Sequence, residues 1–114
     1  MDLKQFNEIL KNCVYTPSSE KNRLIMERTQ YHVVKVLRYA DTVKGERYVI
    51  DLEDTTIALP SRASDAIEKN FPFLCYLLDR IQLGHLFVEL VSIGEGKSEI
   101  KFSAIDWKRK NTAL

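Results

Sequence analysis

The chain has 114 residues, of which 45% are hydrophobic and 29% are charged, and its formal net charge is +1. This size allows one domain with a real core, and the apolar content excludes a disordered chain. A net charge near zero gives no bulk attraction for polyanions, so any binding of nucleic acid depends on where the basic residues lie.

Targeting signals and cysteine usage bear on the compartment. The longest apolar runs, such as FPFLCYLL at 71–78, fall far short of the ~20 residues that a membrane-spanning helix needs. Residues 1–12 are too charged for a secretory signal. Cys13 and Cys75 form no CxxC pair and are expected to be two buried, reduced thiols. We therefore expect an intracellular protein of the cytosol or nucleus, or of the host cell if it is viral.

The first predicted element is an amphipathic helix over residues 2–14, followed by a linker rich in Pro, Ser and charge. These segments form a predicted N-terminal unit at 1–23, before a β-domain at 24–107 and a basic tail at 108–114. The apolar stripe either packs on the β-domain or binds another chain. The residues expected to contact such a partner are Leu3, Phe6, Ile9 and Leu10.

Three strands are predicted next. A long first strand runs from about residue 24 to a turn at Gly45, and its hydrophobic phase slips once between Val33 and Val36. A bulge that bends the strand would produce this slip. The segment RYVIDLED at 47–54 alternates cleanly as a second strand, and a short third strand ends at Pro60.

A helical region and a hairpin complete the chain. Ser64 is the predicted N-cap of a helix that Pro72 interrupts and Gly84 ends, giving one kinked helix or two short ones. Residues 85–93 and 99–107 then form a β-hairpin around GEGKS.

The order of these elements indicates a mainly β protein with helices. The OB-fold is a five-stranded antiparallel barrel whose topology is three consecutive strands, a helix and a closing pair of strands. The predicted elements follow this order, and the N-terminal helix precedes them. A bent first strand suits such a barrel because that strand serves both halves of the sheet. The alternative is an α+β domain in which the same strands form an open sheet under the helices.

One stretch carries a family resemblance. The pattern Y-x-V-x-x-V-x-x-Y-x-x-T-x-x-G-x-R at 31–47, followed by LED and then LPSR at 59–62, resembles small OB-fold single-stranded-DNA-binding proteins of insect viruses and related mobile elements. The resemblance implies a role in replication or recombination. Val43 and Lys44 stand where that group has Lys-Tyr, and Ser61 stands where it has Lys. These departures remove one aromatic ring and one positive charge from the expected binding side.

OB-folds bind single strands on the face of strands two and three and on the flanking loops, where bases stack on aromatic rings and cations follow the phosphates. The residues predicted to do so are Arg38, Tyr39, Lys44, Arg47, Tyr48, Arg62, Lys97, Lys101, Trp107, Lys108, Arg109 and Lys110. For the aromatic residues the alternative is a place in the core or at the end of the barrel. For the basic tail at 108–110 the alternative is a solvated segment without a binding role.

Acidic residues oppose this hypothesis, because Asp51, Glu53 and Asp54 fall where phosphates would pass. The function predicted from the basic and aromatic residues and the resemblance is nevertheless non-catalytic binding of single-stranded DNA, or RNA, with an interaction or oligomerisation module as the alternative. A homodimer or higher oligomer is compatible with either function, since small barrels have few ways to hide an edge strand.

No catalytic residue, metal ligand or cofactor is predicted. His32 and His85 are isolated from other metal-binding residues, and GEGKS lacks the spacing of a phosphate-binding loop.

Overall fold

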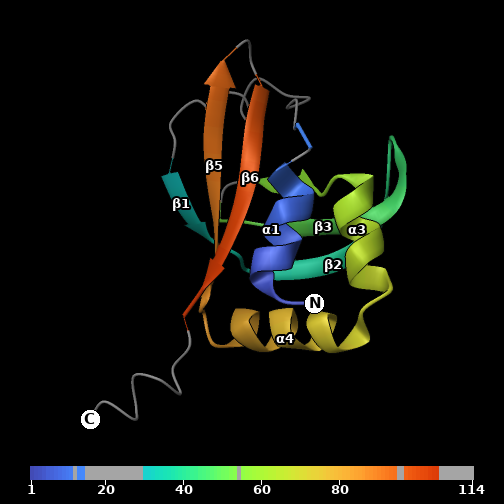
Figure 1. Cartoon of the computed structure of the whole chain (residues 1–114), viewed down its shortest axis with the longest axis vertical. Coiled ribbons are helices and arrows are strands. Elements are labelled where there is room, and N and C mark those ends of the chain that lie inside the picture. The colour runs from blue at the N-terminus through green and yellow to red at the C-terminus, as the bar shows by residue number, and fades with distance from the viewer. Residues whose placement is uncertain (12, 15–29, 54, 95–96, 106–114) are drawn as a thin grey trace.

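The computed structural model describes residues 1–11, 13–14, 30–53, 55–94 and 97–105 (Figure 1). Within them the chain is mainly β with helices, as predicted, and has two three-stranded antiparallel sheets and three helices. The elements are α1 (Leu3–Lys11), β1 (Gln30–Val33), β2 (Val36–Thr42), β3 (Gly45–Asp51), β4 (Thr56–Ala58), α3 (Ser61–Glu68), α4 (Phe71–Gln82), β5 (Leu86–Gly94) and β6 (Lys97–Ala104).

The predicted long first strand is divided between the two sheets, whose orders are β1-β5-β6 and β2-β3-β4. The N–H of Val34 donates to the carbonyl of Leu86 at 2.9 Å, and the N–H of Lys35 donates to the carbonyl of Asp51 at 2.8 Å. Adjacent residues thus bond to opposite sheets, and the chain passes from one sheet to the other at this point. The predicted single strand bent by a bulge is therefore wrong: the phase slip marks a change of sheet between two strands, which is why six strands are described instead of five.

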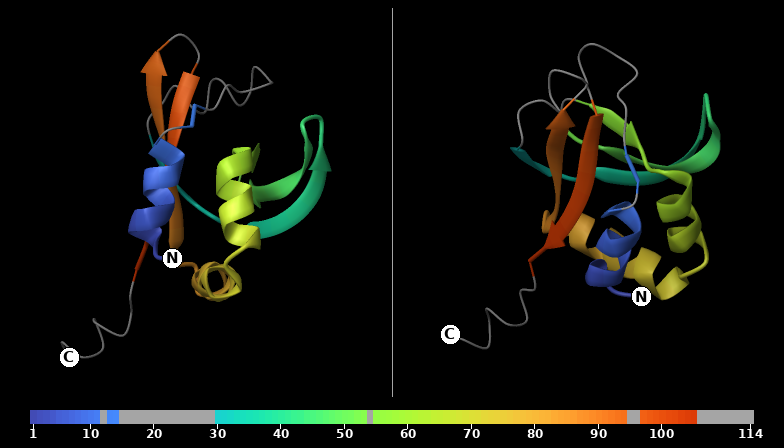
Figure 2. Two further views of the ribbon diagram at one scale, coloured as in Figure 1. Left: turned by 45° about the vertical axis from the view of Figure 1, so that its right-hand side comes forward. Right: turned by 45° about the horizontal axis from the view of Figure 1, so that its top comes forward.

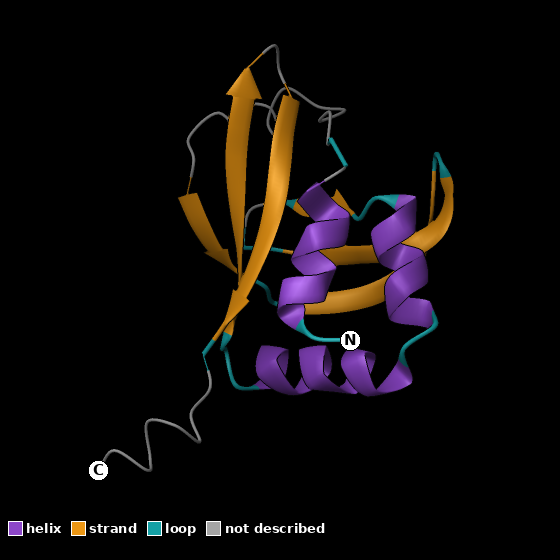
Figure 3. Cartoon of the chain, viewed as in Figure 1, coloured by secondary structure: helices purple, strands orange, loops and turns teal. Residues whose placement is uncertain are grey.

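Helix α1 lies beside the free edge of β6 (Figure 3). The side-chain amide of Asn7 donates to the carbonyl of Phe102 at 2.8 Å and accepts from the N–H of Phe102 at 2.9 Å. The amide therefore takes the place of a neighbouring strand at this position. Among the described residues, no strand pairing joins β4 to β6 to close the two sheets into a barrel.

Replacing Asn7 by alanine should lower the free energy of unfolding by about 1–3 kcal/mol, because a buried N–H and a buried C=O lose their partners. Urea unfolding measures the change. Gln5→Ala, on the exposed side of the same helix, is the control and should cost less. If the two variants were equally stable, the hydrogen bonds between Asn7 and Phe102 would make no net contribution to the free energy of unfolding.

The core is shared by α1 and the rest of the chain. The side chains of Phe6 and Leu10 are fully buried, and the ring centroid of Phe6 lies 5.1 Å from that of Phe73 and 5.4 Å from that of Phe102. The predicted boundary at residue 23 therefore does not divide the core.

The apolar stripe predicted to contact a partner is used within the chain. Phe6 and Leu10 belong to the core, Leu3 packs against it, and Ile9 is half-buried. The stripe of α1 is thus not a free surface for a second protein. The alternative that the sequence left open, packing on the chain's own β-domain, is the one observed.

The helical region differs from the prediction at its start. Helix α3 begins at Ser61 directly after Pro60, so Ser64 is not its N-cap. Ser64 is buried, and its hydroxyl accepts the N–H of Tyr48 at 2.8 Å, which ties α3 to β3. Of the two predicted alternatives, two separate helices are observed, and Pro72 lies in the first turn of α4, where a proline costs no helical hydrogen bond.

Candidate nucleic-acid interface

The predicted binding residues of β2 and β3 lie on two opposite faces of the sheet β2-β3-β4. Tyr39 is paired with Tyr48, which packs against the core, so both tyrosines are on the side of the helices. Arg38 is paired with Val49, which is only 3% exposed but does not belong to the core cluster. Successive residues of a strand point to opposite sides, so the arginines and the tyrosines are separated.

We call the side away from the helices the outer face. It carries Arg38, Arg47, Val49, Asp51 and Thr56. In Figure 2, α3 lies on the concave side of the sheet, opposite the outer face. The described helices do not cover the outer face, but Val49 on this face is only 3% exposed, so the face is not open along its whole length.

Three strands are joined across one end of the outer face by a polar network. Arg38 on β2 donates to both carboxylate oxygens of Asp51 on β3, from Nε to Oδ2 at 2.8 Å and from Nη2 to Oδ1 at 3.2 Å. The hydroxyl of Thr56 on β4 donates to Oδ1 of Asp51 at 2.6 Å. The carboxylate expected to repel phosphates is thus paired with a guanidinium.

These contacts alter the acidity of Asp51. Hydrogen bonds from Arg38 and Thr56 hold the pKa of Asp51 below its ordinary value. A carboxyl group whose pKa is lowered in the folded state stabilises the fold above its unfolded pKa, about 3.9, and that stability is lost as the pH falls through the lowered folded pKa.

Asp51→Asn should therefore reduce the dependence of stability on pH in the acid range. Urea unfolding at pH 7 and pH 3 measures it, and the wild type should lose more stability between the two than the variant does. Glu53→Gln removes an exposed carboxylate just beyond β3 and serves as the control. An unchanged difference between pH 7 and pH 3 in Asp51→Asn would contradict the role of this network.

The turn between β2 and β3 lies at the other end of the outer face. Thr42 Oγ1 donates to the carbonyl of Gly45 at 2.7 Å and accepts the N–H of Lys44 at 3.2 Å. Gly45 has a φ of +105°, which explains why glycine suits this position. Arg47 Nη2 donates to the backbone carbonyl of Lys44 at 3.0 Å, so the guanidinium of Arg47 is fixed at the turn that carries Lys44. Asp51 is four residues from Arg47, or roughly 13 Å along the strand.

The tyrosine pair has acidic surroundings. The rings of Tyr39 and Tyr48 meet edge to face, with centroids 5.0 Å apart, and Tyr39 is 47% exposed. Desolvation, followed by the carboxylates of Glu68, Glu46 and Asp65, raises the pKa of Tyr39. A phosphate beside these rings would meet three carboxylates, so the pair is not suited to stack bases of a nucleic acid strand.

Of the remaining predicted residues, those that the structure describes do not lie on the outer face. Arg62 is exposed but belongs to the first turn of α3, and it does not end a strand as predicted. Lys97 and Lys101 are exposed on β6, in the other sheet. The predicted contacts Trp107, Lys108, Arg109 and Lys110, and the acidic Asp54, lie outside the described residues.

Two features of the site were missed by the sequence analysis. Lys35 is exposed at the point where the first strand passes between the sheets, and the phase slip at this point was the signal that could have identified it. Thr56 completes the network around Asp51, but an isolated threonine gives no pattern by which it could be recognised.

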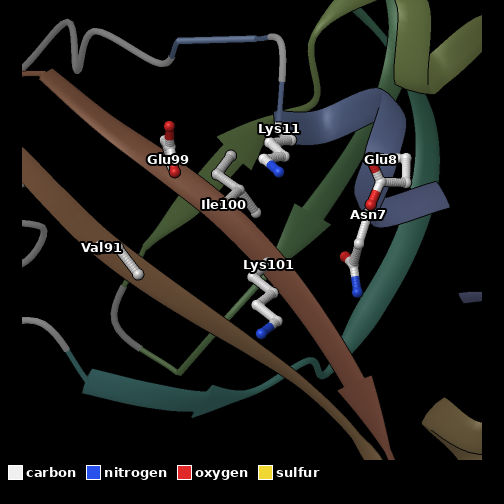
Figure 4. Close-up of a pocket in the computed structure, with 7 residues that line it drawn as sticks. All are labelled: Asn7, Glu8, Lys11, Val91, Glu99, Ile100 and Lys101. Atoms are coloured by element: carbon white, nitrogen blue, oxygen red, sulfur yellow. The ribbon is translucent and has the colours of Figure 1, made fainter. Parts of the chain in front are cut away.

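Described residues away from the outer face also line hollows. One of about 300 Å³ lies between α1 and β6, and Figure 4 shows its lining of Asn7, Glu8, Lys11, Val91, Glu99, Ile100 and Lys101. Another, of about 280 Å³, lies between the start of α1 and the start of α4.

The described residues contain no group of three or more His, Cys, Asp or Glu placed to hold a metal ion. Cys75 is exposed and Cys13 half-buried, so the prediction of two buried thiols is wrong.

Comparison of the chain with family models, with curated proteins and with solved structures gave no match. Within the described residues, no helix combines the length and the apolar character needed to cross a membrane. The function is therefore inferred from the residues of this chain.

Proposed function

We propose that the chain is a non-catalytic protein that binds single-stranded nucleic acid, DNA in preference to RNA, without strong sequence preference. It acts inside cells, in the replication or recombination of a virus or mobile element, as the resemblance at residues 31–62 implies. The proposed binding surface is the outer face of β2-β3-β4 together with the β2–β3 turn.

The observation that carries the proposal is the placement of cations on this surface. Lys44 is exposed in the turn, Arg47 is fixed beside it, and Arg38 lies further along the same face. Arginine has five N–H donors; Arg47 uses one of them on the carbonyl of Lys44 and its Nε is buried, so the donors proposed for phosphate oxygens are its other Nη hydrogens. Binding is strongest at the turn end, because the Arg38 charge is offset by Asp51.

We further propose that the fold is an OB-like barrel in which β1 and β2 together form the bent first strand. The successive hydrogen bonds of Val34 and Lys35 to opposite sheets support this. So does the order of the strands, since each sheet takes part of the first strand and two other strands. In such a fold the outer face of strands two and three is the surface that binds single strands.

Fluorescence anisotropy of a labelled dT oligonucleotide, titrated with the protein at low and at physiological salt, tests the proposed function. Binding that weakens steeply with salt is expected, because protein cations release counterions from the phosphates. A lack of binding even at low salt would reject the proposal.

A second candidate function is an interaction module, and helix α4 favours it. Phe71 is 70% exposed and Leu78 43% exposed, and Cys75 between them is also exposed. These residues are spaced by four and three positions, so they share one side of the helix. An apolar surface of this kind is typical of protein contacts, and it differs from the α1 stripe that the sequence suggested.

A further inference from the structure

The outer face carries cations, but the tyrosines predicted to stack bases lie on the other side of the sheet. Tyr39 and Tyr48 are on the side of the helices. Proteins that bind single strands combine a basic path for the phosphates with aromatic rings on which the bases stack. Tyr31 on β1 is 65% exposed, so its place relative to the outer face is of interest.

Tyr31 points away from the core. It is paired with Glu89 of β5, whereas the next residue, His32, is paired with Val88, which is fully buried in the core. Successive residues of a strand point to opposite sides. Tyr31 therefore lies on the side of the sheet β1-β5-β6 that faces away from the core.

The outward-pointing side of β1 continues into the outer face. Val34 and Leu37 are buried in the core. Lys35 and Val36, between them, are both exposed, at the point where the chain passes from one sheet to the other. Strand β1 leads directly into β2, where Arg38 lies on the outer face (Figure 2). A row of exposed side chains thus follows the chain through the change of sheet.

The charges around Tyr31 suit a nucleic acid strand better than those around Tyr39. A hydrogen bond to the carboxylate of Glu89 raises the pKa of Tyr31 and joins it to the neighbouring strand. Glu89 is itself paired with Lys101 of β6, so its negative charge has a positive neighbour across the sheet. Tyr39, by contrast, has three carboxylates around it.

We propose that Tyr31 is a base-stacking residue, and that the bound strand runs from the β2–β3 turn along β2, past Arg38 and Lys35, to Tyr31. Strand β2 is an edge of the sheet β2-β3-β4, and its exposed residues offer a path beside Val49, which is only 3% exposed. This inference rests on the proposed function and extends the binding surface to β1, beyond the strands and the turn proposed above.

Anisotropy titrations of a labelled dT oligonucleotide of about 16 nucleotides, at several salt concentrations, test the inference. Tyr31→Leu removes the ring and should weaken binding by about tenfold, the effect of losing one stacked base. The slope of log affinity against log salt should stay the same, because stacking releases no counterions. Tyr31→Phe keeps the ring and is the matched control, so it should bind as the wild type does.

Lys35→Ala probes the phosphate path between Tyr31 and Arg38. It should lower the same slope by about 0.7, the contribution of one phosphate contact on a single strand. Tyr31→Leu and Lys35→Ala should thus differ in kind, one changing affinity at constant slope and the other changing the slope.

The outcomes separate this inference from the proposed function. A wild type that does not bind the oligonucleotide would reject both. Binding by the wild type that Tyr31→Leu leaves unchanged, or that Tyr31→Phe weakens equally, would overturn the stacking role alone. A slope unchanged in Lys35→Ala would overturn the path. Thermal unfolding of each variant verifies that these changes at exposed positions leave the fold intact.

Discussion

Phe6→Ala should lower the free energy of unfolding by about 3–5 kcal/mol, the usual cost of removing a buried phenylalanine. The side chain of Phe6 is fully buried, and its ring meets those of Phe73 and Phe102, from α4 and β6. The cavity would open where three elements meet, so little relaxation can fill it. Urea unfolding measures the loss.

Lys4→Ala, on the exposed side of the same helix, is the matched control and should change stability little. The result distinguishes two roles for α1. A helix that served only to bind a partner would leave unfolding unchanged in Phe6→Ala while altering the oligomeric state. Deleting residues 1–14 would accordingly remove part of the core and is unsuitable as a test of partner binding.

The double charge reversal Lys44→Glu/Arg47→Glu should weaken binding of a dT oligonucleotide by at least about tenfold at low salt. Both residues lie at the β2–β3 turn, and Arg47 is tied to the carbonyl of Lys44. Loss of two phosphate contacts should also lower the slope of log affinity against log salt by about 1.4, since each contact on a single strand contributes about 0.7. Anisotropy titrations at several salt concentrations give both values.

The matched control is Lys4→Glu/Lys69→Glu, which changes the net charge by the same amount at exposed positions of α1 and after α3. It should reduce affinity only slightly. Equal losses in the two double variants would mean that net charge, and not the outer face, determines binding. Because Arg47 also bonds to the turn, a thermal melt must show that the turn variant is folded.

The sequence predicted the path of the backbone better than the composition of the site. The slip in hydrophobic phase between Val33 and Val36 marks a local change, and the structure has its change of sheet there. Ser64 was misjudged because its hydroxyl bonds to Tyr48, a residue far along the chain, instead of capping its own helix. A local rule cannot detect such a contact.

The candidate site was predicted as one surface, and the structure divides it. Arg38 and Tyr39 are neighbours in the sequence, as are Arg47 and Tyr48. Because successive side chains of a strand point to opposite faces, the arginine and the tyrosine of each pair had to lie on different faces of the sheet. Which member faces outward depends on the packing of the core against Tyr48, which the sequence alone left open. The role of Asn7 at the edge of β6 had no sequence signal, because it depends on a contact with Phe102.

The most direct test of the central claim is a titration of the isotope-labelled protein with a dT oligonucleotide, followed by the NMR shifts of its backbone amides. We predict that the shifts concentrate in β2, the turn at Lys44, and β3, with the largest at Lys44 and Arg47. Shifts concentrated in α4 or β6, or no shifts at low salt, would contradict it.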